Sequence, residues 1–273
     1  MTKPQALSPK PFMTPFEAFA VDLARAAAAV TLPLFRTGLT GDDKNAGGAF
    51  DPVTRADRDA EAAMRTLIAA RFPDHGVVGE EYGSDRPEAE HVWVLDPVDG
   101  TRAFVAGLPL WTTLIGLRIA RRPTVGVVAQ PYLDEIFLGG PSGARMIRGG
   151  QDTPLAVRAC PRLNDAVIAT TDPDLFTGAE RGAWTQVRAT ARLARLGCDA
   201  YAYAMVAAGH VDLVAETGLK SWDWTALVPL VEAAGGQVTD WLGAPPSGDG
   251  RILAVGDAAL KDQALLTLRR AVD

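Results

Sequence analysis

Two aspartates stand three residues apart at the end of an apolar run, in the segment 91–101 with the sequence HVWVLDPVDGT. Residues 92–95 are apolar throughout, which is typical of a strand buried on both faces. At such a strand end Asp96 and Asp99 would repel each other and lose solvation, and a divalent cation would remove that penalty. Gly100 lets the backbone approach a ligand, and Thr101 offers a hydroxyl and a free amide at the expected start of a short helix, 101–106. The segment therefore indicates a metal ion beside a phosphate.

The same segment also fits a simpler interpretation. Asp-Pro and Asp-Gly are common turn dipeptides, and such a turn could do no more than cap a helix. Further acidic residues stand where the chain is expected to change direction, namely Asp51, Glu80, Glu81 and Asp223. Each alone could be structural, and Asp223 could be a helix N-cap. Together they offer oxygen ligands, which suit Mg²⁺, whereas isolated histidines at 75, 91 and 210 form no zinc cluster with cysteine.

The first half of the chain, residues 14–150, is predicted to be an α+β unit. Thr14, Pro15 and Glu17 form a helix-start signal, with a capping threonine and a glutamate three residues later. A second helix is expected at about 54–72, and its buried residues are predicted to be Ala60, Met64, Leu67 and Ile68. Strands are expected at 77–78, 91–95, 114–119, 125–129 and 136–138, the last three forming an antiparallel meander sheet.

The second half, residues 151–273, predicts mixed α/β structure in which strands alternate with helices. The expected strands are 167–170, 193–196, 211–215 and 252–255, and the expected helices are 181–190, 199–209, 223–234 and one from 257. Pro229 should kink the helix that contains it. A glycine-rich loop is expected at 41–50, but no linker divides the chain. We therefore expect one compact layered body with a cleft between the two halves, the first carrying most metal ligands and the second Asp223 and the substrate contacts.

The composition narrows the classes of partner. The chain has 273 residues, 48% hydrophobic and 22% charged, which is ordinary for a globular protein with a sizeable core. A net charge of −6 without a long basic stripe argues against nucleic acid as the main partner. No apolar run approaches the ~18 residues needed to cross a bilayer. Two cysteines make no disulfide framework, and no signal peptide opens the chain. These features predict a cytoplasmic protein that does not act at a membrane.

Three motifs, taken in order, resemble those of the inositol monophosphatase superfamily. They are Gly79-Glu80-Glu81, the segment 93–101, and Trp222-Asp223 followed by Ala234-Gly235-Gly236. The resemblance covers nearly the whole chain, from the first helix to Trp241. It implies a layered α-β-α-β-α sandwich like that of the fructose-bisphosphatases. It also implies a lithium-sensitive phosphatase that uses two or three Mg²⁺ ions, acts on a small phosphorylated substrate and forms a homodimer.

Finer segments are similar to the histidinol-phosphate phosphatase branch of that superfamily. They are residues 100–110, 170–176, 199–203, 208–223 and 226–232. This resemblance implies that the substrate is L-histidinol phosphate, with inositol 1-phosphate or another small polyol or sugar phosphate as the alternative. A regulatory or binding protein on the same scaffold is an alternative of a different class. Trp111-Thr112, Cys198 and the loop 44–51 depart from the usual pattern, and the first two are expected near the substrate.

The resemblance assigns the metal ligands residue by residue. Glu80, Asp96 and the backbone carbonyl of Val98 would hold one Mg²⁺. Asp96, Asp99 and Asp223 would hold a second, with Asp96 bridging the two. A carbonyl ligand explains why an apolar residue, Val98, stands at the centre of an acidic site.

The resemblance also implies roles around the attacking water and the phosphate. Glu80 and Thr101 would orient the water and accept its proton. Asp51 would accept a hydrogen bond from Thr101. The amides of Gly100 and Thr101 would bind phosphate at the helix start. Arg102 could reach the phosphate or pair with a nearby acid, and the sequence leaves both open.

Two further acids match family positions that contact the substrate away from the phosphate, Asp199 and Glu216. Histidinol carries an amine and an imidazole, so two carboxylates at that end would favour histidinol over inositol. The structural alternatives are a helix N-cap for Asp199 and a solvated strand end for Glu216. The sequence alone does not choose between these alternatives.

Overall fold

The computed structural model describes residues 12–38, 42–43 and 52–272. α1 (Pro15–Thr31) begins as predicted, with Glu17 N donating to Thr14 Oγ1 at 3.2 Å and Thr14 N donating to Glu17 Oε2 at 2.6 Å. This capping box gives partners to two amides that the helix itself leaves without one. The expected loop at 41–50 lies mostly outside the described residues, apart from β1 (Asp42–Asp43), which pairs with β2 (Pro52–Val53).

α2 (Arg55–Arg71) begins with a second capping box, formed by Thr54 and Asp57. Its buried face contains the predicted Ala60, Met64 and Ile68 together with two carboxylates, Asp57 and Glu61. The prediction for Leu67 is wrong, since this side chain is 39% exposed. At 100° per residue, Leu67 lies about 80° around the helix from Asp57, at the margin of the buried stripe. The helix therefore carries two acids into the interior, where apolar side chains were expected.

The first sheet has eight strands in the order β10 (Gln151–Pro154), β9 (Gly143–Arg148), β8 (Glu135–Gly140), β7 (Arg122–Gln130), β6 (Thr112–Ile119), β5 (His91–Asp99), β3 (Gly76–Gly79) and β4 (Gly83–Asp85). β5 to β10 pair antiparallel in chain order, which confirms the meander, and β3 runs parallel to β5. β4, β9 and β10 were not predicted, because they are short and lack a clear apolar alternation.

β5 continues further than the sequence predicted. It was expected to end at Leu95, but it pairs with β6 as far as Asp99, with a register shift between Asp96 and Asp99. A shift of this kind lets one strand carry extra residues and turns side chains away from the regular alternation. The irregularity is therefore what allows two aspartates of one strand to reach the same site.

The second sheet has five strands in the order β12 (Leu193–Leu196), β11 (Val167–Thr170), β13 (Leu213–Leu219), β15 (Gly250–Val255) and β14 (Gln237–Thr239). β11 is parallel to β12 and β13, whereas β15 is antiparallel to β13 and β14. The remaining helices are α3 (Thr101–Val105), α4 (Gly178–Thr190), α5 (Tyr201–Ala207), α6 (Ser221–Trp224), α7 (Leu227–Ala233) and α8 (Ala258–Leu268). Short 3₁₀ turns occur at η1 (Leu32–Leu34), η2 (Pro131–Leu133), η3 (Leu163–Asp165), η4 (Pro173–Leu175) and η5 (Arg269–Ala271).

The helix predicted at 223–234 is two helices, and the break does not lie at Pro229. α6 ends at Trp224 and α7 starts at Leu227, so Pro229 is the third residue of α7. A proline has no N–H and clashes with the carbonyl four residues earlier, which here belongs to Thr225. The interruption therefore lies one turn before the proline, and it leaves α6 as a separate short helix.

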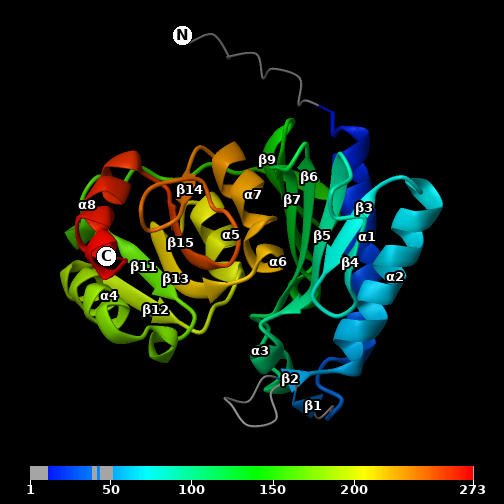
Figure 1. Ribbon diagram of the computed structural model, residues 1–273, viewed down its shortest axis with the longest axis horizontal. Helices are drawn as coiled ribbons and strands as arrows, with labels where there is room; N and C mark the ends of the chain where they lie inside the picture. Colours follow the sequence, from blue (N-terminus) through cyan, green and yellow to red (C-terminus); the bar gives the residue numbers. More distant parts are fainter. Residues whose placement is uncertain (1–11, 39–41, 44–51, 273) are drawn as a thin grey trace, which may run out of the picture.

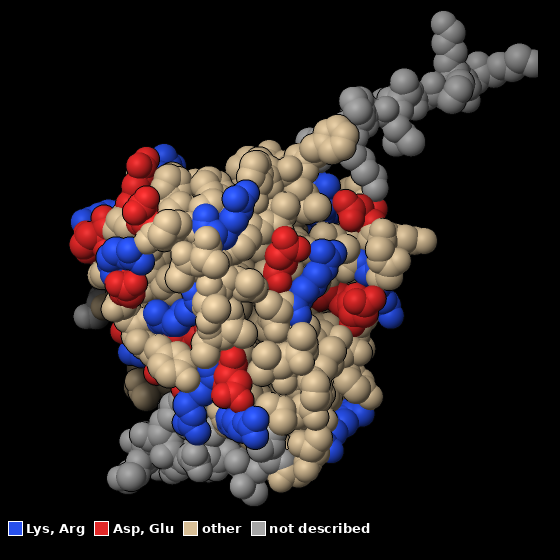
Figure 2. Space-filling model, turned by 90° about the vertical axis from the view of Figure 1, so that its right-hand side faces the viewer, with Lys and Arg blue, Asp and Glu red and all other residues tan. Residues whose placement is uncertain are grey.

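The elements stack in five layers (Figure 1). α1 and α2 cover the outer face of the first sheet, α5, α6 and α7 lie between the sheets, and α4 and α8 cover the second sheet. This is the predicted α-β-α-β-α arrangement, which is confirmed. On the face shown in Figure 2, acidic and basic side chains lie next to one another rather than in separate patches. Within the described residues, the helices are too short or too polar to cross a bilayer.

His75 and His91 are isolated in the sequence but stack on each other in the structure. Their ring centroids lie 4.7 Å apart with an interplanar angle of 11°, and Trp93 Nε1 donates to His75 Nδ1 at 3.1 Å. The prediction of isolated histidines is therefore wrong for this pair, because the parallel pairing of β3 and β5 places the residues before Gly76 and Val92 side by side. Burial, together with the charge of His91, lowers the pKa of His75 below its usual 6.5.

We expect this histidine pair to make part of the stability sensitive to acid. The pKa of His75 is lower in the folded than in the unfolded chain, so its contribution is complete above about pH 6.5 and is lost as the pH falls. Melting temperatures of the wild type and His75→Asn between pH 7.5 and 5.5 should show a shallower decline in the variant. The exposed His210, replaced by asparagine, should keep the wild-type slope. Parallel curves for wild type and His75→Asn would contradict the assignment.

Candidate active site

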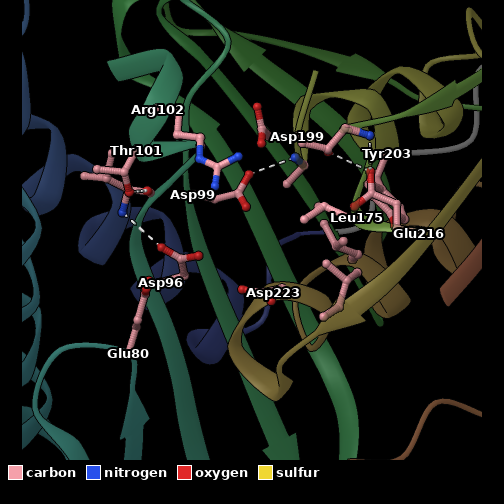
Figure 3. A pocket seen from close by; sticks show the side chains of 16 residues that line it. Glu80, Asp96, Asp99, Thr101, Arg102, Leu175, Asp199, Tyr203, Glu216 and Asp223 are labelled. Carbon is pink, nitrogen blue, oxygen red and sulfur yellow. Dashed lines mark hydrogen bonds between the residues drawn. The ribbon is translucent and has the colours of Figure 1, made fainter. Parts of the chain in front are cut away.

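A pocket of about 270 Å³ opens between the two sheets (Figure 3). The ends of β3 and β5 and the start of α3 form one wall, and α5, α6 and β13 form the other. The lining residues are Glu80, Asp96, Val98, Asp99, Gly100, Thr101, Arg102, Thr171, Leu175, Asp199, Ala200, Tyr203, Glu216, Leu219, Asp223 and Leu227. Apart from Asp51, which lies outside the described residues, every residue for which the sequence implied a metal, catalytic or substrate-binding role lines this pocket.

Three carboxylates converge in the pocket from segments far apart in the chain. Asp96, Asp99 and Asp223 each offer an oxygen atom, and these atoms lie within 4.8 Å of one another. Asp96 and Asp99 come from the irregular end of β5, and Asp223 comes from α6. Asp223 is not an N-cap, because it is the third residue of α6 and its Oδ2 accepts the Lys220 N–H at 2.6 Å. Three hard oxygen donors at this spacing fit a divalent cation such as Mg²⁺.

The electrostatics of the cluster support the same fit. Burial, followed by the charge of Asp199, raises the pKa of Asp99 from 3.8 to about 8. Burial and the charge of Asp99 raise the pKa of Asp223 to about 8, against the opposing effect of the Lys220 N–H. Burial and the charge of Glu80 raise the pKa of Asp96 well above its usual range. Without a cation, Asp99 and Asp223 would hold protons at neutral pH, because their pKa values are about 8, and a cation would replace those protons.

The turn between β5 and α3 brings backbone groups and a hydroxyl to the cluster. Gly100 has φ 79°, in the left-handed region, and a Cβ atom there would lie 3.1 Å from the carboxylate carbon of Asp199. Thr101 Oγ1 lies 3.0 Å from the Val98 carbonyl oxygen and 3.3 Å from Asp57 Oδ1. Among the described residues, the acid that lies beside the Thr101 hydroxyl is therefore Asp57, on α2.

Asp57 was missed in the sequence, although a signal was present. It belongs to the capping box at Thr54, which accounts for an acid at this position without any further role. Its burial could nevertheless be predicted from the spacing of the helix residues. Asp57 lies three residues before Ala60 and seven before Met64, on the stripe expected to face the core. Burial raises the pKa of Asp57, against the hydrogen bonds from Thr54.

Two acids form the opposite wall of the pocket. Glu216 accepts hydrogen bonds from Thr171 N at 2.9 Å and Thr171 Oγ1 at 2.7 Å, and it is only 7% exposed, so it is not a solvated strand end. Asp199 precedes Ala200, which occupies the N-cap position of α5, so Asp199 is not the N-cap. Burial and the charge of Glu216 raise the pKa of Asp199 to about 7. Burial also raises the pKa of Glu216 to about 7, against the hydrogen bonds of Thr171.

Asp99 connects the two walls. Its Oδ2 accepts a hydrogen bond from Ala200 N at 2.7 Å and lies 3.3 Å from Thr112 Oγ1. The residue before Ala200, Asp199, has φ 45°, a left-handed conformation that is uncommon for a residue other than glycine. The hydrogen bond from Ala200 N to Asp99 joins the start of α5 to the end of β5 across the cleft.

The structure shows where Arg102, Trp111 and Thr112 lie. Arg102 Nη1 lies 3.8 Å from Asp172 Oδ2, so an acid partner is present at the pocket mouth. Trp111, expected near the substrate, is fully buried against Phe35 and Phe104 and does not line the pocket. That expectation is wrong, because the Trp111 side chain packs with Phe35 and Phe104 in a buried aromatic cluster. The neighbouring Thr112 contacts Asp99 instead.

Similarities to known proteins cover nearly the whole chain. The model of the inositol monophosphatase family matches residues 13–272. The bifunctional phosphatase IMPL2, chloroplastic, of Arabidopsis thaliana is 39% identical over 93% of this chain and 75% of its own length. A histidinol-phosphatase of Chlorobaculum parvum is 32% identical over 91% of this chain and 94% of its own. The structure of an inositol monophosphatase from Zymomonas mobilis superposes with a TM-score of 0.83, at 39% identity over 93% of this chain and 97% of that one. The chain belongs to the inositol monophosphatase family.

Proposed function

We propose that the protein is a Mg²⁺-dependent phosphomonoesterase whose preferred substrate is L-histidinol phosphate. The observation that carries this proposal is the distribution of acids in the pocket, with Asp96, Asp99 and Asp223 in one cluster and Asp199 and Glu216 as a second pair of acids in the lining. The first group suits metal ions and the phosphate they neutralise. The second group suits a substrate end that carries positive charge or N–H donors. Relatives named as histidinol-phosphatases support the same choice.

The metal ligands in this proposal are Glu80, Asp96, Asp99, Asp223 and the carbonyl of Val98, which would hold two or three Mg²⁺ ions. When bound, Mg²⁺ supplies positive charge for the phosphate and the leaving oxygen. It also lowers the pKa of a bound water, so that this water can lose a proton and attack phosphorus. Hydrolysis of a phosphate monoester depends on positioning and charge neutralisation rather than on covalent chemistry by the protein. We therefore expect no phosphorylated enzyme.

Side chains around Thr101 would place the attacking water. Thr101 and Glu80 would orient it for in-line attack and accept its proton. The carboxylate of Asp57 faces the Thr101 hydroxyl and would take part in holding it, since the two oxygens lie 3.3 Å apart. The role of Asp51 in accepting from Thr101 stays a prediction. The amides of Gly100 and Thr101 would bind the phosphate, in a part of the pocket that Arg102 also lines.

The far wall would recognise the rest of the substrate. Asp199 and Glu216 have pKa values near 7, so an ammonium or imidazolium group placed between them would favour their charged forms. Inositol offers only neutral hydroxyls to the same two carboxylates. Inositol 1-phosphate remains the second candidate, because the Zymomonas mobilis structure with 39% identity is that of an inositol monophosphatase. The homodimer and the cytoplasmic location stay predictions.

Phosphate release from L-histidinol phosphate and inositol 1-phosphate, measured side by side with Mg²⁺, tests the proposal. We expect kcat/KM to favour histidinol phosphate by about a hundredfold, or roughly 2.7 kcal/mol of transition-state discrimination. Glu216→Gln should reduce that preference, whereas Glu232→Gln, outside the pocket, should leave it unchanged. Equal or reversed rates would leave the metal chemistry intact and assign Asp199 and Glu216 to a polyol substrate.

A further inference from the structure

The turn that carries Glu80 is held by a buried acid from another element. Glu61 lies on α2 and is completely buried. Its Oε2 accepts the Glu81 N–H at 2.8 Å, and its Oε1 lies 3.2 Å from Tyr82 N. Both amides follow Glu80 directly in the chain. A single carboxylate thus satisfies two successive backbone donors at the end of β3.

The residue before Glu80 shows how closely this acid approaches the turn. A Cβ atom built on Gly79 would lie 2.0 Å from Glu61 Oε1, so a glycine is needed at this position for the carboxylate to sit there. On the other side Glu80 N donates to the Leu95 carbonyl at 3.2 Å, which ties the turn to β5. The backbone of Glu80 is therefore fixed on one side by the neighbouring strand and on the other by Glu61.

A charged partner keeps the carboxylate of Glu61 in place. Arg65 Nε donates to Glu61 Oε1 at 2.8 Å from one turn later on α2, and its Nη2 donates to the Gly83 carbonyl. The same pair of side chains thus contacts the backbone at both ends of the segment from Glu81 to Gly83. A buried carboxylate is stable only when its charge and lone pairs have partners, and here most of these partners are the backbone of the turn.

We propose that Glu61 is a positioning residue for the reaction, which holds Glu80 in the orientation that binds Mg²⁺. The inference rests on the proposed function, because it takes Glu80 to be a metal ligand. The simpler possibility is that Glu61 only fastens α2 to the first sheet. The two roles predict different effects of replacing Glu61. If Glu61 positions Glu80, its replacement weakens Mg²⁺ binding, whereas if Glu61 only joins α2 to the sheet, its replacement lowers the stability of the fold alone.

Glu61→Gln separates these possibilities, because glutamine keeps the size of the side chain but has one acceptor oxygen instead of two. Its NH₂ group would face a backbone N–H of Glu81 or Tyr82, so the turn would lose at least one hydrogen bond. We expect the dissociation constant of Mg²⁺, measured by calorimetric titration of the full chain without substrate, to rise about tenfold or more. Glu80→Gln should weaken binding in the same direction.

The matched control is Glu17→Gln. Glu17 is also completely buried and also accepts hydrogen bonds from backbone and hydroxyl donors, Thr14 N, Ser142 N and Ser142 Oγ, but it lies on α1 away from the pocket. Its replacement should lower the melting temperature and leave Mg²⁺ affinity unchanged. A double-variant cycle adds a second readout: if Glu61 acts through Glu80, Glu61→Gln should have no further effect on Mg²⁺ binding once Glu80 is glutamine.

The outcomes are distinct. Wild-type Mg²⁺ affinity in Glu61→Gln, with a lower melting temperature, overturns this inference and leaves the proposed function standing. Absence of Mg²⁺ binding by the wild type, or wild-type binding by Glu80→Gln, overturns the metal assignment and the inference with it. Should Glu61→Gln not fold, Arg65→Gln provides the same test with the carboxylate still present. A rise in its Mg²⁺ dissociation constant supports the inference, and an unchanged value overturns it.

Discussion

Replacing Asp99 by asparagine is expected to lower kcat by roughly 10³-fold, which corresponds to about 4 kcal/mol of transition-state stabilisation. Asp99 belongs to the three-carboxylate cluster and is the acid that also accepts the Ala200 N–H across the cleft. Asparagine can still accept that hydrogen bond, so the geometry of the two walls should persist. What it removes is the negative charge that a divalent cation needs.

The same variant should be at least as stable as the wild type when Mg²⁺ is absent. The pKa of Asp99 is about 8 in the metal-free protein, so at pH 7 the group is mostly protonated, and asparagine resembles that neutral form. Steady-state kinetics with Mg²⁺ and melting curves in a chelator check the two parts. Asp174→Asn, an exposed acid on η4, should change neither quantity. Near wild-type turnover in Asp99→Asn would remove this residue from the metal site.

Stability without Mg²⁺ is expected to fall as the pH rises, and Mg²⁺ should restore it. Asp99 and Asp223 have folded pKa values of about 8, and Asp199 has one of about 7, all above the usual 3.8. A group whose pKa is raised on folding stabilises the folded state fully at pH values below its unfolded pKa. That contribution is lost as the pH rises through the folded pKa. Deprotonation between about pH 6 and 9 therefore leaves buried charges that repel one another.

Melting temperatures measured from pH 6 to 9, with a chelator or with saturating Mg²⁺, test this linkage. The stabilisation by Mg²⁺ should be small at pH 6 and reach about 10 °C near pH 8.5, the size expected for a few kcal/mol in a chain of this length. Replacing Asp223 by asparagine should flatten the chelator curve over the same range. Curves that stay parallel with and without Mg²⁺ would show that the carboxylates do not bind the ion.

Local signals in the sequence predicted most elements. The capping box of Thr14 and Glu17 located the start of α1, and the apolar run 92–95 located β5, because both depend on residues within one or two turns or on a simple alternation. Elements without such a signal were missed, for example β4 and β10. The break before α7 was placed one turn too late, since a proline disturbs the residue four positions earlier rather than its own position.

The candidate site was predictable in its chemistry and only partly in its members. Asp96, Asp99 and Asp223 could be named from acid types at strand and helix ends, and the structure places them in one cluster. Asp57 and Glu61 were not named, because an acid on a helix is most often exposed, although the spacing of Asp57 placed it on the stripe expected to face the core. Their inward orientation depends on partners from β3, β5 and α3 that lie far away in the chain.

By itself the sequence determined which donors the protein can offer and roughly which elements carry them: carboxylates without a histidine or cysteine cluster, at the ends of an apolar strand and near a short helix. These features follow from interactions between near neighbours in the chain. Only the tertiary structure decided which acids share one pocket, that Ala200 N faces Asp99, and that Glu61 lies under the turn of Glu80. The physical reason is that these contacts depend on how two sheets pack against helices, and small differences in register or helix rotation would place the same side chains elsewhere.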